Sequence, residues 1–398
     1  MRARVLVAAI VLLGSLAARA GETIPNIQTG YENGFFLKTD DDRFRFKFGS
    51  RVVFGFSEGI LSTALNYGKF DALYAKFFAG GNAFGADLQY YFEAAAASNP
   101  RPIGPVPNPA SNAGTFVLDD YFVRYLHGDM ILKLGRFKVP FGRGWTVLDS
   151  SLEFVNRSGA VQAFTFGRDL GVAFTWERPA FAATAGIFNG GRDTKLGVGY
   201  DVFAFTPATP PAATVGGNGF LYVARVVAMP FGPAGNTEGD VEDSEGSRLD
   251  LGAGAVLDHR RDADFNWDGV LDDTKVSVLT AATDITWKRE GKSVQGEFFY
   301  RKIYAAATPE TTGMGFYLQP GYFLVPRKLE LAGRLGWLDP DLDKPGDRIW
   351  EAAGALNLHF SGDHRYKTQL QYAWKRFDDR VAGPKDDHFI DLVFQLTI

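Results

Sequence analysis

The chain has 398 residues and a formal net charge of -4, from 42 basic and 46 acidic side chains, and it contains no cysteine. The absence of cysteine excludes a disulfide framework, and the acidic balance gives no support to nucleic-acid binding.

Residues 1–20 predict a signal peptide. Arg2 and Arg4 precede a short apolar run, and an A-x-A cleavage pattern ends at Ala20. The apolar run is too short to anchor the protein by spanning a bilayer. We therefore expect an exported protein, with residues 21–42 as an N-terminal periplasmic segment. Beyond the leader, no stretch reaches about 18 consecutive apolar residues, so no transmembrane helix is predicted.

From residue 43 onward, apolar and polar side chains alternate with period two. In residues 43–56, RFRFKFGSRVVFGF, the even positions are mostly Phe or Val, while the odd positions include Arg43, Arg45, Lys47 and Arg51. A strand places these two sets on opposite faces, whereas a helix would scatter both around its axis. Abundant Phe (35) and Tyr (15) fit the lipid-facing half of a membrane β-barrel.

The same alternation, over runs long enough to cross a bilayer when tilted, predicts sixteen strands. Their ranges are 43–57, 70–80, 84–97, 115–126, 131–138, 168–177, 180–188, 219–230, 247–257, 275–289, 292–304, 314–322, 326–338, 348–360, 364–376 and 387–398. The fold class is thus all-β, a 16-stranded antiparallel transmembrane β-barrel covering residues 43–398.

Short and long connections alternate between these strands, which is typical of outer-membrane barrels with short periplasmic turns and longer outer loops. The one exception is 231–246, a long acidic turn on the short side. Because the strand number is even, both termini should lie in the periplasm. The expected location is the bacterial outer membrane, where the barrel contacts lipid and lipopolysaccharide.

Strand parity also predicts which charges face the lumen. The inward cations include Arg43, Arg45, Lys47, Arg51, Lys76, Arg124, Lys133, Arg225 and Arg334. They modestly outnumber the inward acids, and a basic channel of low dielectric concentrates anions. We therefore expect small anions as solutes. The alternative is that mixed charges pair across strands and only hold the wall together.

Residues 264–275 contain the D-x-N-x-D-G spacing of a calcium loop. Asp264, Asn266, Asp268 and Asp272 would supply the oxygen ligands, but position 12 is Lys275 where such loops place a bidentate Glu. A structural calcium ion and an acidic turn without metal both remain open. No other cofactor is expected.

Several segments resemble, in the same order, the phosphate-selective porins of the O and P type. They are GFFLKTDDDRFRFKFGSRV, FVLDDYFVRYL, GRFKVPFG, FNGG, GFYLQPGYFLVPRKLELAGRLGWLD and LNLHFSGDHRYKTQLQYAW. The resemblance implies a homotrimeric porin with an infolded third loop, and a preference for phosphate or polyphosphate in some members. The arginine ladder of the phosphate-selective members has no residue-for-residue match here, and the chain ends in Ile398 where barrels commonly end in Phe.

If the third long connection, 139–167, folds inward as the resemblance implies, Lys133, Arg136, Lys138 and Arg143 lie at the constriction. The alternative is a solvated outer loop whose arginines pair with lipopolysaccharide or with Asp149 and Glu153.

The sequence favours a passive channel over an enzyme. An outer-membrane hydrolase and a plugged structural barrel remain as alternatives, although no G-x-S-x-G or H-E-x-x-H motif is present.

Overall fold

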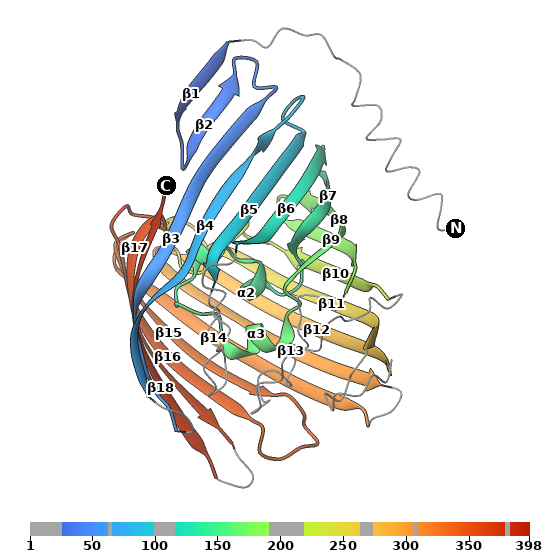
Figure 1. The fold of residues 1–398 in the computed structure, drawn as a ribbon, viewed down its shortest axis with the longest axis vertical. Helices are drawn as coiled ribbons and strands as arrows, with labels where there is room; N and C mark the ends of the chain where they lie inside the picture. Colours follow the sequence, from blue (N-terminus) through green and yellow to red (C-terminus); the bar gives the residue numbers. More distant parts are fainter. Residues whose placement is uncertain are drawn as a thin grey trace.

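The structure is a computed structural model that describes residues 26–62, 66–98, 116–190, 219–262, 274–305, 309–378 and 383–398. Within them, sixteen antiparallel strands, β3 to β18, form a sheet that closes where β18 pairs with β3 (Figure 1). This confirms the predicted barrel. The strands are β3 Arg45–Ile60, β4 Tyr67–Asn82, β5 Leu88–Ser98, β6 Phe116–His127, β7 Met130–Lys138, β8 Arg168–Arg178, β9 Phe181–Phe188, β10 Leu221–Ala228, β11 Arg248–Asp262, β12 Thr274–Arg289, β13 Lys292–Ala305, β14 Thr311–Val325, β15 Leu329–Asp339, β16 Ile349–His359, β17 Tyr366–Phe377 and β18 Lys385–Thr397.

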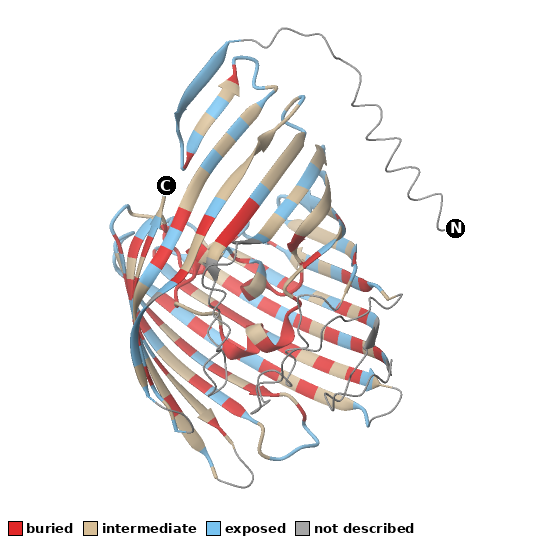
Figure 2. Ribbon diagram, viewed as in Figure 1, coloured by how far each residue is buried: buried red, intermediate tan, exposed pale blue. Residues whose placement is uncertain are grey.

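Burial follows the predicted alternation along the strands, as the red and pale blue bands of Figure 2 show. On β17, for example, Gln369 is buried inside the barrel while its neighbour Leu370 is 48% exposed on the outside. Leu370 lies beside Leu356 of β16 and Leu392 of β18, so the outer face carries a continuous apolar surface. Such a surface is stable against lipid hydrocarbon, which explains why so many large apolar side chains face outward.

A short hairpin precedes the barrel. It consists of β1 (Ile27–Tyr31) and β2 (Phe35–Thr39), and its turn uses Asn33 and Gly34, both with positive φ. Strand β2 pairs with the first residues of β3, and β18 pairs with the rest of β3 from Arg51 onward. The two strands therefore follow one another along the same side of β3. The strands predicted from period two begin only at residue 43 and do not include this hairpin.

Two irregular segments lie inside the barrel. The first, which we call the constriction loop, comprises residues 139–167 and contains α2 (Arg143–Thr146), η1 (Asp149–Ser151) and α3 (Gly159–Phe164). Its two short α-helices lie within the ring of strands (Figure 1), so the infolded third loop is confirmed. The second, the inner turn, comprises residues 229–247 between β10 and β11, at the place where the sequence predicted an exceptionally long acidic turn.

Candidate functional site: the lumen and its constriction loop

The constriction loop is fastened to the wall of β13 to β18 by buried polar side chains. Arg301 of β13 donates hydrogen bonds to the carbonyls of Ala163 (3.0 Å) and Phe164 (2.7 Å) at the end of α3. From β17, the Lys367 ammonium donates to the carbonyl of Leu152 (2.7 Å). Because these donors satisfy loop carbonyls that water cannot reach, they hold the loop backbone in one position.

The inner turn reaches the constriction loop and adds to the filling of this side. The Glu238 amide donates to the Ser151 carbonyl (3.1 Å), and the Glu153 amide donates to the Glu238 carboxylate (2.8 Å). Arg143 of α2 donates to the carbonyl of Gly235 (2.7 Å) and pairs with Asp250 of β11 (3.1 Å). The lumen next to β11 to β18 is therefore packed like a protein core.

Glu153 lies at the centre of this packing and is fully buried. Its carboxylate accepts hydrogen bonds from Gln319 (2.5 Å) and Ser293 (3.0 Å). Burial raises the pKa of Glu153 well above its ordinary value, and the neighbouring carboxylates of Glu330 and Glu238 raise it further. The protonated form of Glu153 is therefore stabilised relative to that of an exposed glutamate.

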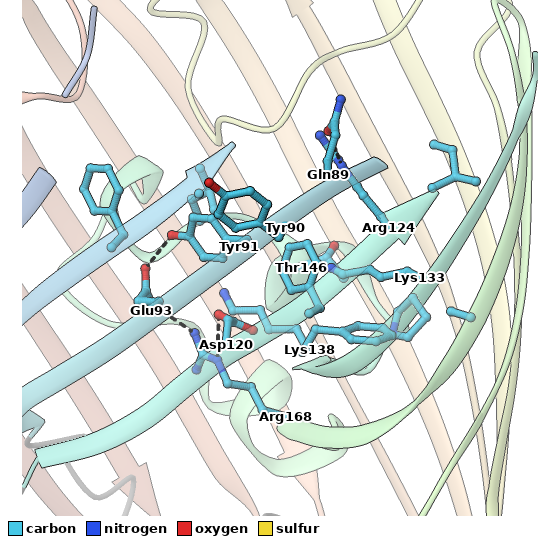
Figure 3. Close-up of a pocket in the computed structure, with 18 of the residues that line it drawn as sticks. Gln89, Tyr90, Tyr91, Glu93, Asp120, Arg124, Lys133, Lys138, Thr146 and Arg168 are labelled. Atoms are coloured by element: carbon cyan, nitrogen blue, oxygen red, sulfur yellow. Dashed lines mark hydrogen bonds and ion pairs between the residues drawn. The ribbon is translucent and has the colours of Figure 1, made fainter. Parts of the chain in front are cut away.

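Among the described residues, a cavity of about 860 Å³ lies in the lumen between the constriction loop and the wall of β3 to β9 (Figure 3). Charged side chains line it unequally. Seven cations contribute, namely Arg45, Lys47, Arg51, Arg124, Lys133, Lys138 and Arg168, against the four acids Glu93, Asp120, Asp149 and Glu177. Fixed charges of one sign in a narrow passage concentrate ions of the other sign, so this cavity favours anions.

Six of the twelve residues that the sequence placed along the pore line this cavity: Arg45, Lys47, Arg51, Arg124, Lys133 and Lys138. Lys133 lies between two rings, with its Nζ 3.6 Å from the centroid of Phe122 and 4.2 Å from that of Phe137. Arg124 donates to the Gln89 side chain (2.6 Å).

The other six are not among the cavity-lining residues. Arg143, Arg225 and Arg334 lie on the packed side, where carboxylates bind them: Asp250 at 3.1 Å, Asp284 at 2.6 Å and Glu351 at 3.1 Å, respectively. Lys76 is buried against Asp149 of the constriction loop (2.9 Å). Arg43 lies in the turn before β3, and Arg136 donates to the Asp119 carbonyl (3.2 Å). Strand parity predicted which side chains face the lumen, but not which of them the constriction loop and the inner turn cover.

Arg51 differs from the other lumen arginines. It lines the cavity and is only 9% exposed, and its Nε is buried without a hydrogen-bond partner among the described residues. Directly across the strand pair lies Lys76. A guanidinium with donors to spare, next to a second cation, can offer fixed hydrogen bonds to an oxyanion that enters the cavity.

Four cations surround Asp149 of η1, which lines the cavity. The carboxylate lies 2.9 Å from Lys76, 3.0 Å from Lys138, 2.7 Å from Arg157 and 3.8 Å from Arg168. Burial alone would raise the pKa of Asp149, but the four cations outweigh it and hold the pKa well below its ordinary value. We call these five residues the constriction cluster.

Sequence reasoning missed one carboxylate of this region because of a β-bulge. The pairing of β5 with β6 shifts register between Glu93 and Ala94, so Asp119 has no cross-strand partner of its own in that pairing. Strict alternation would place it on the side opposite Asp120. Instead, its carboxylate lies 2.7 Å from the Lys76 ammonium. Bulges re-aim side chains in this way and leave no mark in the period-two pattern.

Neither a membrane-spanning helix nor a metal cluster occurs among the described residues. None of the helices there has the length and apolar character needed to cross a membrane. No group of three or more His, Cys, Asp or Glu side chains in that part of the chain is arranged to hold a metal ion. The predicted calcium ligands, Asp264, Asn266, Asp268 and Asp272, lie outside the described residues.

A closed barrel with an infolded loop beside a charged passage defines a porin. The family model of phosphate-selective porin O and P matches residues 63–397, so the chain belongs to that family and is an outer-membrane porin. No curated protein sequence matches it.

Solved structures share the fold at low identity. An anion-selective porin from Comamonas acidovorans has a TM-score of 0.58 at 11% identity, covering 89% of this chain and 100% of that one. The outer membrane channel DcaP of Acinetobacter baumannii has 0.58 at 10%, covering 89% and 97%. A trimer form of OmpT, an outer membrane protein of Vibrio cholerae, has 0.50 at 9%, covering 88% and 99%.

Proposed function

We propose that this porin is a passive diffusion channel for small hydrophilic solutes that prefers anions, oxyanions of the phosphate class among them. The observation that carries the proposal is the charge of the cavity wall, where seven cations face four acids although the whole chain is acidic. Family membership and the anion-selective porin of similar fold support the same preference. The cavity is only partly enclosed, which suits flux because a permeating ion must leave as readily as it enters.

Arg51 and Lys47 should contribute strongly, because both line the cavity and no carboxylate of the described residues lies within ion-pair distance of either. A unit charge about 4 Å away changes the free energy of an ion by about 1 kcal/mol in water. Each cation therefore raises the local anion concentration by roughly fivefold. Replacing both by Gln should lower the chloride-to-potassium permeability ratio by at least about 25-fold.

The test is a reversal potential in a planar bilayer under a tenfold potassium chloride gradient. Wild type should give the sign of an anion-selective channel, and the double variant should move toward zero. Lys292→Gln is the matched control, because Lys292 is exposed at the turn that starts β13. A cation-selective wild type, or an equal shift in the control, contradicts the proposal. Folded protein without steady current would favour the plugged structural barrel.

The assembly we propose is a homotrimer embedded in outer-membrane lipid. The apolar outer face supports it, as does the trimer form recorded for OmpT, which has a similar fold. Unheated gel electrophoresis and light scattering in detergent would measure the oligomer directly. A monomer by both methods would contradict the assembly but leave the channel proposal intact.

A calcium ion in the loop 264–275 is also proposed, on the spacing of its acidic residues alone. Chelation should then raise the protease sensitivity of this loop in the folded porin, since a bound ligand stabilises the state that binds it. Asp264→Ala together with Asp268→Ala should abolish the response. A wild type that is indifferent to the chelator would exclude calcium.

A further inference from the structure

The carboxylate of Asp149 occupies the position that an anion would take in the constriction cluster. Lys138 and Arg168 line the cavity (Figure 3), as does Asp149. Lys76 and Arg157 are not among the lining residues, but both contact the Asp149 carboxylate. The Asp149 side chain remains 18% exposed. Lys138 and Arg157 contact one of its oxygens, Oδ1, and Lys76 contacts the other, Oδ2. A carboxylate of the protein's own loop is thus bound as a permeating oxyanion would be.

The four cations do not depend on Asp149 for their positions. The Val147 carbonyl accepts hydrogen bonds from Lys138 (2.9 Å) and from Arg157 (2.7 Å). Arg157 also donates to the Gly144 carbonyl (2.7 Å). Because uncharged backbone acceptors hold both side chains, these two cations should stay in place when the Asp149 charge is removed.

The remaining two cations are anchored by wall carboxylates. Lys76 lies 2.9 Å from Glu93 and 2.7 Å from Asp119, and Arg168 lies 3.1 Å from Asp120. These contacts come from strands β5 and β6 of the barrel wall, not from the constriction loop. The cation cluster is therefore preorganised by its surroundings, as a binding site must be.

Charge balance shows what Asp149 changes. The four cations of the constriction cluster, together with Asp149 and the wall carboxylates of Glu93, Asp119 and Asp120, form a set of eight side chains with four positive and four negative charges, so this set is neutral as it stands. Without the Asp149 charge the same space carries one net positive charge, next to the cavity-lining Arg51. Preorganised donors with excess positive charge bind oxyanions strongly.

We propose that Asp149 is an internal competitor for permeating anions and thereby a specificity-determining residue of this channel. It fills the oxyanion site of the constriction cluster, so monovalent anions pass without binding there. A multivalent oxyanion of the phosphate class binds only by displacing it, which keeps the site shallow and the flux high. This inference rests on the proposed anion preference and specifies how tightly the site holds its ions.

The experiment measures block of the chloride current by inorganic phosphate in a planar bilayer, for wild type and Asp149→Asn. Asn keeps the size of the side chain and removes its charge. The half-blocking phosphate concentration should fall by at least about tenfold, equivalent to about 1.4 kcal/mol, and the single-channel chloride conductance should fall with it. Glu177→Gln is the comparison variant, because Glu177 lines the same cavity outside the constriction cluster. Its half-blocking concentration should change by less than about twofold.

Equal changes in the two variants would overturn the proposal, because they would reflect only the net charge of the lumen. A higher conductance of Asp149→Asn without tighter block by phosphate would also overturn the proposal, since that result would mean that the constriction loop has detached from the wall. If Asp149→Asn does not fold, Asp149→Glu decides, because it keeps the charge and should bind phosphate no more tightly than wild type. Tighter block by Asp149→Glu overturns the inference. Reversal potentials of wild type, measured in the same membranes, test the anion preference separately.

Discussion

Loss of Arg301 should loosen the constriction loop without unfolding the barrel. Arg301 is 1% exposed and donates to two loop carbonyls, those of Ala163 and Phe164. Its guanidinium also lies 5.2 Å from the ring of Phe164 and 5.1 Å from that of Phe166. Hydrogen bonds from a charged group contribute about 1.5–3 kcal/mol each, so replacing Arg301 by Met should weaken loop docking by about 3–6 kcal/mol.

Methionine retains apolar contact with the two rings, and the backbone pairing of β13 with β12 and β14 does not involve the side chain. The loss should therefore fall on the α3 end of the loop. With about 1.4 kcal/mol per factor of ten, local opening becomes more frequent by roughly 10²–10⁴. Single-channel recordings at fixed voltage should show frequent closures and excess current noise.

The matched control is Lys302→Met. Lys302 is the next residue of β13, points away from the loop and pairs with Glu310 at 2.6 Å. The substitution removes a cation of similar size from the same strand, and the current noise and closure frequency of this variant should equal those of wild type. If Arg301→Met is equally quiet, the hydrogen bonds from Arg301 do not hold the loop, and the reasoning is refuted.

Two further predictions concern the lipid face and the packed side. Leu370→Arg should lower the free energy of unfolding by about 2–4 kcal/mol, because it places a charge in hydrocarbon near mid-strand. Thr184→Arg faces the cavity and should lower the free energy of unfolding far less. Urea titration in lipid vesicles measures both changes, and equal changes would contradict the assigned faces. Burial beside Glu330 and Glu238 raises the pKa of Glu153 above its ordinary 4.5. The free energy of unfolding should therefore carry no penalty from Glu153 below about pH 4.5, and it should fall as the pH rises toward the raised pKa. Glu153→Gln should remove this loss, and thermal unfolding of both proteins across the pH series would show whether the two profiles differ.

The strands could be predicted from the sequence because lipid imposes one requirement along their whole length. Every second side chain must be apolar over a run long enough to cross the bilayer, and few other folds impose that for so long. Residues 43–56 carry this signal clearly. For the same reason the alternation alone places Arg45, Lys47 and Arg51 on the inner face of β3.

Parity could not predict the division of the lumen. Arg225 and Arg334 have the same inward position as Arg51, yet they are paired with Asp284 and Glu351 on the packed side. What separates them is the path of the constriction loop and the inner turn, which depends on contacts between residues more than a hundred positions apart. The position of Asp149 among four cations could not be predicted for the same reason, because a lone carboxylate in a loop belongs to no periodic pattern.

The hairpin of β1 and β2 has a consequence for the integrity of the sheet edge. Strand β18 pairs with β3 from Arg51 onward, and the backbones of Ile398 and Ser50 exchange two further hydrogen bonds (2.7 and 2.9 Å). Strand β2 covers the start of β3, from Phe48 to Arg45. Without it, aromatic residues and unpaired backbone groups would form an open edge, the arrangement through which sheets aggregate. A chain lacking residues 26–40 should therefore assemble into a barrel that adheres to other barrels at the rim where β3 begins.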